Sequence, residues 1–458
     1  MSFKTTSVLL FNPWIYDFAA YDFWCKPLGL LHLGARLREL GCRVHLVDCL
    51  DRFHPQLLRH VGQSAAKSKS DVSGKFHREI IKKPQVLAHV PRYYARYGMP
   101  PEVVHQLLDA IDEPPQFILV TSFMTYWYPA VRDAVALLRA RFPHAEILLG
   151  GIYATLCPDD AQHTIRPDVL IRGEAEHSVV EYLASRLGVP APPAPQHLDA
   201  LPLPAFDLYP RLKSVALMTS RGCPNRCSFC ASHALATGYR RRSVNHVVAE
   251  IQHWAHSHQV QHMAFFDDAL LHRAKECIKP ILRAVIEKRL DVRFYTPNGL
   301  TPRFVDAELA ELFYASGVQN VRLSFETINP ERQKRMSSKV TSVELQRAVQ
   351  HLFDAGYASD SIGVYVLMGL PGQHPEEVMA SAEFVHRLGV NINLASFSPL
   401  PGTLEWQNAI EANLWQPQND LLLTNTTLFP IWSQTVGYAA AVDLDRQVKS
   451  MNQRLRKE

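Results

Sequence analysis

Three cysteines crowd into residues 221–230 at the spacing C-x3-C-x2-C. Thiolates packed this tightly cannot all be core residues, so Cys223, Cys227 and Cys230 are predicted to meet at one soft metal centre. Three is one fewer than the four thiolates that close a [4Fe–4S] cluster. The spacing therefore favours a cluster with one iron open to a ligand from outside the protein.

A structural zinc site is the alternative for the same stretch. His233 follows Cys230 after two intervening residues, and a Cys3His set can hold zinc as a non-catalytic knuckle. The two sites differ in their iron and sulfide content, so metal analysis separates them.

The run R-G-C-P-N-R-C-S-F-C at residues 221–230 resembles the signature of the radical S-adenosylmethionine enzymes. The resemblance implies that the open iron binds the amino group and carboxylate of S-adenosylmethionine. It also implies reductive cleavage of that molecule to a deoxyadenosyl radical, a small-molecule substrate, and a reductant such as flavodoxin or ferredoxin. The strands and helices after the cysteines agree with this family, which favours the cluster over zinc.

Composition narrows the class of protein. The chain has 458 residues, enough for about three domains, with 47% hydrophobic and 20% charged residues. The formal net charge of +4 is too small to indicate nucleic acid or an acidic membrane surface as a partner. No apolar run approaches the ~18 residues of a membrane span, so we expect no membrane association.

The remaining cysteines indicate the compartment. Cys25, Cys42, Cys49, Cys157 and Cys277 are scattered without paired spacing, which is typical of reduced thiols. The first residues lead directly into a strand-like run and do not resemble a signal peptide. We therefore expect a cytoplasmic protein.

The first third alternates strands with helices. Strands are predicted at residues 7–12, 43–48, 117–123, 146–152 and 168–174, and helices at 27–40, 128–142 and 176–187. This alternation predicts an α/β domain over residues 1–188, a flavodoxin-like doubly wound parallel sheet. Ligands of such sheets bind at the carboxyl ends of the strands, here the loops at 12–14, 48–49, 122–127, 150–153 and 173–174.

This domain resembles the cobalamin-binding domain that precedes many radical enzymes. The matching pieces are P-L-G-L at residues 27–30, the pair Gly150 and Gly151, and G-E-x-E at 173–176. The resemblance implies that the two glycines let the backbone approach the corrin. The D-x-H-x-x-G motif that ligates cobalt is missing, because His54 has the wrong spacing. Cobalamin bound without a protein histidine, and a domain that has lost cobalamin, both remain open.

An insertion at about residues 50–115 has no strand signal. It is basic in its first part, at Lys67, Lys69, Lys75, Arg78, Lys82 and Lys83. A solvated charged face is favoured here, and a site for a polyanion is the alternative.

A proline-rich stretch predicts a stiff linker at residues 189–213, with seven prolines between 189 and 210. A first strand and five strand–helix pairs then follow over 214–403, which predicts a partial (β/α)6 TIM-type barrel with its chemistry at the carboxyl ends of the strands. The strands are expected at 214–220, 263–268, 293–298, 320–326, 361–370 and 391–398. The helices are expected at 244–256, 275–288, 306–316, 342–355 and 376–388, and Thr341 with Glu344 predicts a capping box.

Polar residues follow the later strands. The family usually places a glycine–glycine–glutamate run after the second strand, to grip the methionine amino group, and here Asp267 and Asp268 take that position without the glycines. Asn298, Ser324 and Glu326 are suited to bind ribose hydroxyls or the methionine part, and Gly369 opens a turn that can meet adenine. The family resemblance implies that these residues hold S-adenosylmethionine.

Residues 404–458 are predicted to form a mostly helical tail, and they contain no second cysteine cluster. The whole pattern indicates a radical S-adenosylmethionine enzyme, with a cobalamin-dependent methyltransferase favoured. A cobalamin-independent rearrangement, cyclisation or oxidation is the second possibility, and the zinc-knuckle protein is the third.

Overall fold

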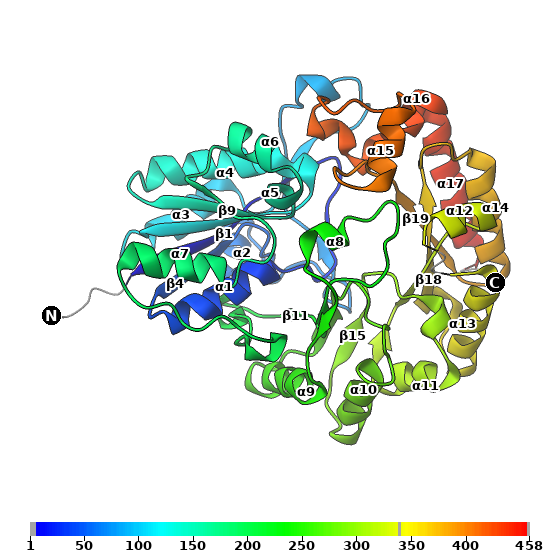
Figure 1. The fold of residues 1–458 in the computed structure, drawn as a ribbon, viewed down its shortest axis with the longest axis horizontal. Helices are drawn as coiled ribbons and strands as arrows, with labels where there is room; N and C mark the ends of the chain where they lie inside the picture. The colour runs from blue at the N-terminus through cyan, green and yellow to red at the C-terminus, as the bar shows by residue number, and fades with distance from the viewer. Residues whose placement is uncertain (1–5, 338–339, 456–458) are drawn as a thin grey trace. The chain divides into compact units, whose positions relative to one another are not determined.

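The structure, a computed structural model, describes residues 6–337 and 340–455. The chain divides between Val215 and Ala216 into two compact units (Figure 1). The division lies beyond the proline-rich stretch, which therefore belongs to the first unit.

A five-stranded parallel sheet forms the centre of the first unit. Its strands stand in the order β10-β9-β8-β1-β4, which in chain order is the 2-1-3-4-5 arrangement of flavodoxin-like folds. Parallel pairing sets Val8 beside both Val44 and Phe117. The strands are β1 (Ser7–Asn12), β4 (Arg43–Asp48), β8 (Phe117–Ser122), β9 (Glu146–Gly151) and β10 (Val169–Leu170).

Helices cover both faces of this sheet. The helices α1 (Leu28–Glu39) and α7 (Ser178–Leu187) share one face, where Leu37 and Leu183 join a buried cluster with Leu10. Figure 1 shows α4 (Tyr128–Arg141) on the opposite side. Two faces covered by helices explain why the strands read as continuous apolar runs.

The prediction of an insertion without strands was wrong. Three short strands form an antiparallel sheet in the order β2-β7-β6, and β3 pairs with β5. Each has two or three residues, too few to show the alternation that marks a strand in sequence. Their bounds are β2 (Ile15–Asp17), β3 (Tyr21–Asp22), β5 (Gly74–Lys75), β6 (Arg78–Ile80) and β7 (Ala95–Tyr97), and the helices of this region are α2 (Pro55–His60) and α3 (Pro101–Asp109).

The proline-rich stretch packs against the rest of the first unit. Phe206 is fully buried, the Ala205 N–H donates to the Leu31 carbonyl at 3.0 Å, and the Tyr209 hydroxyl donates to Asp48 Oδ2 at 2.6 Å. Apolar residues between the prolines supply this contact, although the prolines themselves cannot join a sheet.

Parallel sheets also form the second unit, in an arrangement consistent with a partial barrel. A four-stranded sheet has the order β11-β14-β15-β16, and a three-stranded sheet has the order β17-β18-β19. A parallel bridge between Leu300 and Leu323 connects the segment after β15 with β17. The bounds are β11 (Ser214–Leu217), β14 (His262–Phe265), β15 (Arg293–Tyr295), β16 (Val318–Gln319), β17 (Val321–Glu326), β18 (Ile362–Met368) and β19 (Asn391–Ser396).

Helices surround the outer side of these strands (Figure 1). The predicted capping box is present, since the Glu344 N–H donates to Thr341 Oγ1 and the Thr341 N–H donates to Glu344 Oε2 at 2.8 Å. The helices are α9 (Val244–Gln252), α10 (Ile278–Glu287), α11 (Ala307–Ala315), α13 (Ser342–Asp354) and α14 (Pro375–Arg387).

The tail is helical, as predicted, with α15 (Leu404–Glu411), α16 (Trp432–Thr435) and α17 (Tyr438–Leu455). The Asn452 side chain exchanges hydrogen bonds with both backbone groups of Ile392, each at 2.8 Å. The tail therefore pairs with β19, the edge strand of its sheet. Within the described residues, no helix combines the length and apolar character needed to cross a membrane.

Candidate functional site

The three cysteines lie on a loop with a closed base. The strand β12 (Ser220–Arg221) pairs antiparallel with β13 (Arg240–Arg241), and the cysteines lie between them in the chain. Gly222 has φ +76°, and a Cβ there would lie 2.1 Å from the Gly238 carbonyl oxygen. Only glycine fits this close approach of two backbones, so the glycine before Cys223 fixes where the loop begins.

Asp267 holds the residues that lead into this loop. Its carboxylate is 3% exposed and accepts hydrogen bonds from the backbone N–H and the hydroxyl of both Thr219 and Ser220, at 2.6–3.0 Å. Burial raises the pKa of Asp267, and these hydrogen bonds oppose the rise. The sequence suggested this carboxylate for the cofactor's amino group, and the structure instead gives it partners within the protein.

The cysteine side chains are neither fully buried nor fully exposed. The Cys227 and Cys230 sulfurs each lie 3.2 Å from a serine hydroxyl, that of Ser337 and Ser232 respectively. The Ser232 N–H also donates to Cys230 Sγ at 3.5 Å. Three sulfur donors on one accessible loop, with hydrogen-bond donors beside them, have the chemistry that an iron–sulfur cluster requires.

The described part of the chain has no group of three His, Cys, Asp or Glu side chains placed to hold a single metal ion. A [4Fe–4S] cluster binds each thiolate on a different iron, so its ligands need not converge on one point. His233, the additional ligand of the zinc alternative, is exposed on α8 (Ser232–Leu235).

Asp268 lies beside the cysteine loop, in contrast to its neighbour. Desolvation raises the pKa of Asp268, and the nearby Ser232 hydroxyl opposes the rise. The residue as a whole is exposed. Ser232, which contacts Cys230 Sγ, lies near Asp268, so the second aspartate is accessible and close to a cluster ligand.

Glu326 also meets the cysteine loop. It ends β17 at an irregularity in the pairing with β18, and it has the left-handed φ of +71°. It lines a small pocket together with Cys227, Phe229 and Thr327. Several non-glycine residues of the described chain have positive φ, and Glu326 is the one among them that the sequence suggested for the cofactor.

Asn298 and Ser324 have structural contacts. The Asn298 side chain donates to the carbonyls of Phe266 and Asp267 at 3.0 and 3.2 Å, which ties the ends of two neighbouring strands together. Ser324 is buried, and a Cβ at Gly299 would lie 2.2 Å from its hydroxyl.

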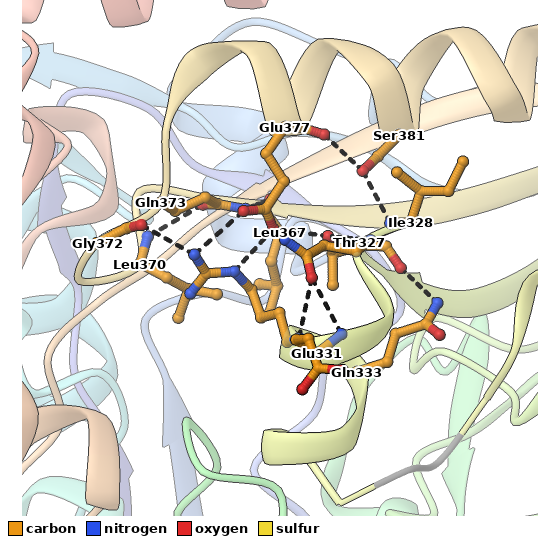
Figure 2. Close-up of polar contacts among 12 residues, drawn as sticks. Thr327, Ile328, Glu331, Gln333, Leu367, Leu370, Gly372, Gln373, Glu377 and Ser381 are labelled. Atoms are coloured by element: carbon orange, nitrogen blue, oxygen red, sulfur yellow. Dashed lines mark hydrogen bonds and ion pairs between the residues drawn. The ribbon is translucent and has the colours of Figure 1, made fainter.

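An ion pair that the sequence did not predict connects the turns after β17 and β18 (Figure 2). Arg332, on α12 (Pro330–Arg335), binds Glu377 of α14 through Nε–Oε1 at 2.7 Å and Nη2–Oε2 at 3.1 Å. Arg332 also donates to the Gly372 carbonyl at 3.0 Å, and the Thr327 hydroxyl donates to Glu377 Oε1 at 2.7 Å. The pair thereby fixes the segment after Glu326.

Gly369 opens the turn after β18 that this ion pair supports. It has φ +92°, which requires glycine. The Gln373 side chain closes the turn, accepting from the Leu370 N–H at 3.2 Å and donating to the Leu367 carbonyl at 3.0 Å. The Trp432 indole donates to the Gln373 carbonyl at 3.0 Å, so a residue of the tail steadies the same turn.

The glycine pair of the first unit has two different environments. Gly151 has φ +98°, and a Cβ there would lie 2.2 Å from the Ser122 carbonyl oxygen. The close contact with β8 is therefore enough by itself to require glycine at this position. A Cβ at Gly150 would meet Ile171 at an ordinary 3.7 Å.

His54 caps α2 by accepting the Gln56 N–H at 3.2 Å, so its Nδ1 is engaged. At the same strand ends, Asn12 donates to Asp48 at 2.7 Å. The side-chain contacts here provide no cobalt ligand, and a fit to cobalamin rests on the backbone at the strand ends.

Arg241 and Arg242, which follow the cysteine loop, form ion pairs within the protein. Arg241 pairs with Glu276 at 2.7 Å, and Arg242 pairs with the buried Glu250 while donating to the Met218 carbonyl. These arginines brace the strand that closes the base of the cysteine loop.

Residues 217–385 match the family model described as the radical SAM superfamily. An uncharacterized methyltransferase of Pyrococcus horikoshii is 28% identical over 313 residues, covering 60% of this chain and 65% of the relative. An anaerobic magnesium-protoporphyrin IX monomethyl ester cyclase of Rubrivivax gelatinosus is 24% identical, over 57% of this chain and 52% of the relative. This chain thus spans less than two thirds of either relative.

A solved structure has a similar fold. It is the radical S-adenosylmethionine methyltransferase TsrM of Kitasatospora setae with cobalamin and a [4Fe–4S] cluster bound. It is 18% identical to this chain, with a TM-score of 0.63, and the match covers 89% of this chain and 78% of that one.

Proposed function

This chain belongs to the radical S-adenosylmethionine superfamily, and from that membership we propose that it is a cobalamin-dependent methyltransferase acting on a small molecule. One observation carries the proposal: three cysteines lie on an accessible loop between β12 and β13, soon after β11, the first strand of the four-stranded sheet. The name of the Pyrococcus relative and the ligands of the Kitasatospora structure support methyl transfer and cobalamin.

Cys223, Cys227 and Cys230 would hold the [4Fe–4S] cluster. When bound, the cluster supplies the electron that splits S-adenosylmethionine into methionine and a deoxyadenosyl radical, and cobalamin supplies the methyl group. The protein's own contribution is to position the reactants and to keep water out. Gly150, at the carboxyl end of β9, is the backbone position that we assign to the corrin.

Carboxylates beside the loop would bind the cofactor's ammonium group. Asp268 and Glu326 both lie close to cluster ligands: Asp268 is near Ser232, which contacts Cys230, and Glu326 lines the pocket with Cys227. A carboxylate attracts an ammonium group strongly where water is partly excluded. Asp267 positions the loop and does not itself contact the cofactor, and Asn298, Ser324 and Gly369 shape the strand ends for the nucleoside.

Anaerobic reconstitution with iron and sulfide tests this proposal. With a strong reductant, the protein should form deoxyadenosine from S-adenosylmethionine, and Cys227→Ala should abolish that reaction and lose most of the iron. Cys42→Ala is the matched control, because Cys42 is a buried cysteine of the first unit. Deoxyadenosine formation by Cys227→Ala would overturn the assignment, as would zinc bound without iron and sulfide.

Radical chemistry without cobalamin is the second candidate. The engagement of His54 in capping α2 favours it, and so does the relative named as a cyclase. Purification with hydroxocobalamin separates the two, because a methyltransferase of the proposed kind should retain the corrin absorption at about one equivalent. Protein that takes up the cluster but no corrin supports the second candidate.

A further inference from the structure

A pocket of about 460 Å³ lies in the segment that interrupts the sheet of the first unit. This volume is within the ~300–1,000 Å³ typical of small-molecule sites. None of the residues assigned above to the cluster, to S-adenosylmethionine or to cobalamin lines it. The pocket is therefore separate from the sites assigned above, and a ligand bound in it would be an additional one.

The floor of the pocket is apolar. Leu57 and Leu58 of α2 and Phe76 after β5 line it, and each is buried to within 8% exposure. Tyr21 of β3 forms a wall. Two leucines and two aromatic rings offer a surface that favours an aromatic or aliphatic group over water.

The rim of the pocket is positively charged. Lys67, Lys69 and Lys75 line it and are exposed, whereas no aspartate or glutamate is among the lining residues. Lys69 Nζ lies 5.4 Å from the centre of the Tyr21 ring. Within the described chain none of the three lysines has a carboxylate partner. Three unmatched positive charges around one opening repel one another, and an anion between them removes that cost.

The rim is held in place by a buried guanidinium. Arg52 is 4% exposed, pairs with Asp22 at 2.9 Å, and donates to the carbonyls of Lys67 and Val72 at 3.2 and 2.6 Å. A Cβ at Gly74 would lie 2.6 Å from Arg52 Nη1, so glycine makes room for this support. Because Asp22 matches the charge of Arg52, the lysines remain the free cations of the rim.

We propose that this pocket binds an organic phosphate with an apolar body. The phosphate lies among Lys67, Lys69 and Lys75, and the body lies on Leu57, Leu58 and Phe76. The sequence favoured a solvated face for the basic stretch over a polyanion site, and the pocket between the lysines is the observation that supports an anion site instead. The inference does not depend on the radical chemistry, so either can fail without the other.

Phenyl phosphate is the probe, measured by calorimetry at low ionic strength because salt screens exposed charges. It should bind at least about tenfold more tightly than inorganic phosphate, which lacks the body, and than phenol, which lacks the charge. If phenyl phosphate and inorganic phosphate bind equally well, the apolar floor does not bind the body of the ligand. If phenyl phosphate and phenol bind equally well, the lysines of the rim do not bind the phosphate. No binding of phenyl phosphate would overturn both assignments.

The triple variant Lys67→Gln/Lys69→Gln/Lys75→Gln should weaken phenyl phosphate binding by about tenfold or more. The control Lys82→Gln/Lys213→Gln/Lys288→Gln removes the same charge from exposed lysines outside the pocket and should leave the affinity unchanged. Both variants should form deoxyadenosine at the unaltered rate. Equal weakening in the two variants would show a general charge effect and refute the site.

A protection experiment needs no variant. Acetylation of the native protein, read by mass spectrometry, should slow at Lys67, Lys69 and Lys75 when phenyl phosphate is added, and should not slow at Lys82 or Lys213. Protection that is absent, or equal at all five lysines, contradicts the proposal.

Discussion

Arg332 and Glu377 form a two-point ion pair whose side chains are 8% and 13% exposed. The pair joins the segment after Glu326 to the turn that begins at Gly369, the ends of two adjacent strands that are assigned to the cofactor. Arg332 also donates to the Gly372 carbonyl, and Thr327 donates to Glu377, so each charged group of the pair makes a further hydrogen bond. We therefore regard the pair as the support that positions Glu326 beside Cys227.

Glu377→Gln should destabilise the second unit. It leaves the Arg332 guanidinium buried without its counter-charge, and breaking such a pair costs about 3–5 kcal/mol. The midpoint of urea unfolding should fall accordingly, and protein folded at low temperature should bind S-adenosylmethionine more weakly at unchanged iron content. Glu376→Gln makes the same change at the exposed neighbouring residue of α14 and should be near neutral. Equal stability of the two variants would contradict the assigned role.

Asp267→Asn should reduce cluster loading. An amide nitrogen in place of Oδ2 sets a donor against the Thr219 N–H, and the loss of charge weakens the hydrogen bonds that Oδ1 accepts from Thr219 and Ser220. The change costs about 1–3 kcal/mol and loosens the start of the cysteine loop. Iron and sulfide per protein after anaerobic reconstitution should fall to less than half. Full iron content in this variant would mean that the loop does not depend on Asp267.

Asp268→Asn should leave the iron content unchanged and weaken the binding of S-adenosylmethionine. Asp268 lies near Ser232 but does not hold the base of the loop, so the iron content should stay at the native level. The affinity for S-adenosylmethionine should fall by about tenfold, the effect of one charged contact of about 1.4 kcal/mol. Equilibrium dialysis measures it, and unchanged affinity would remove Asp268 from the cofactor site.

Asp51 should make stability depend on pH. Its side chain is 2% exposed, and burial raises its pKa from 3.8 to about 6, with Lys26 opposing the rise. Because the folded state then binds the proton more tightly than the unfolded state, the free energy of unfolding should increase as the pH falls from 7 to 5. The full effect is up to about 3 kcal/mol.

Asp51→Asn should flatten that dependence and stabilise the protein at pH 8. The amide oxygen can still accept the Phe53 N–H, as Asp51 Oδ1 does at 3.0 Å. Urea unfolding between pH 5 and pH 8 measures both variants. A native protein whose stability falls from pH 7 to pH 5, with the same slope in Asp51→Asn, would contradict the role of this carboxyl.

Ser232→Ala should lower the reduction potential of the cluster. The Ser232 hydroxyl lies 3.2 Å from Cys230 Sγ, and hydrogen bonds to cluster sulfurs favour the reduced state. Loss of one bond of about 1 kcal/mol corresponds to a negative shift of some tens of millivolts. A redox titration followed by electron paramagnetic resonance measures it. Ser228→Ala is the control, since the Ser228 hydroxyl donates to Glu405 instead, and an equal shift there would refute the explanation.

The sequence predicted the elements better than their contacts. The long strands of both units and the Thr341 capping box follow from local patterns and were found, and the observed 2-1-3-4-5 order is that of the predicted flavodoxin-like class. Asp267 and Asp268 look alike in sequence, and only the folded chain shows that one faces the protein and the other the loop. Nothing local links Arg332 to Glu377, which lie 45 residues apart. The helix α12 was not predicted, although an asparagine before a proline is a typical helix start, and the Asn329 side chain accepts the N–H groups of Glu331 and Arg332.

We propose that Cys223, Cys227 and Cys230 hold a [4Fe–4S] cluster with one iron open to S-adenosylmethionine. The decisive measurement is electron paramagnetic resonance of the anaerobically reconstituted, reduced protein, with and without S-adenosylmethionine. We expect a cluster signal that changes when S-adenosylmethionine is added and that is missing in Cys227→Ala. A protein that stays colourless and takes up neither iron nor sulfide, or a cluster signal that S-adenosylmethionine leaves unaltered, would contradict it.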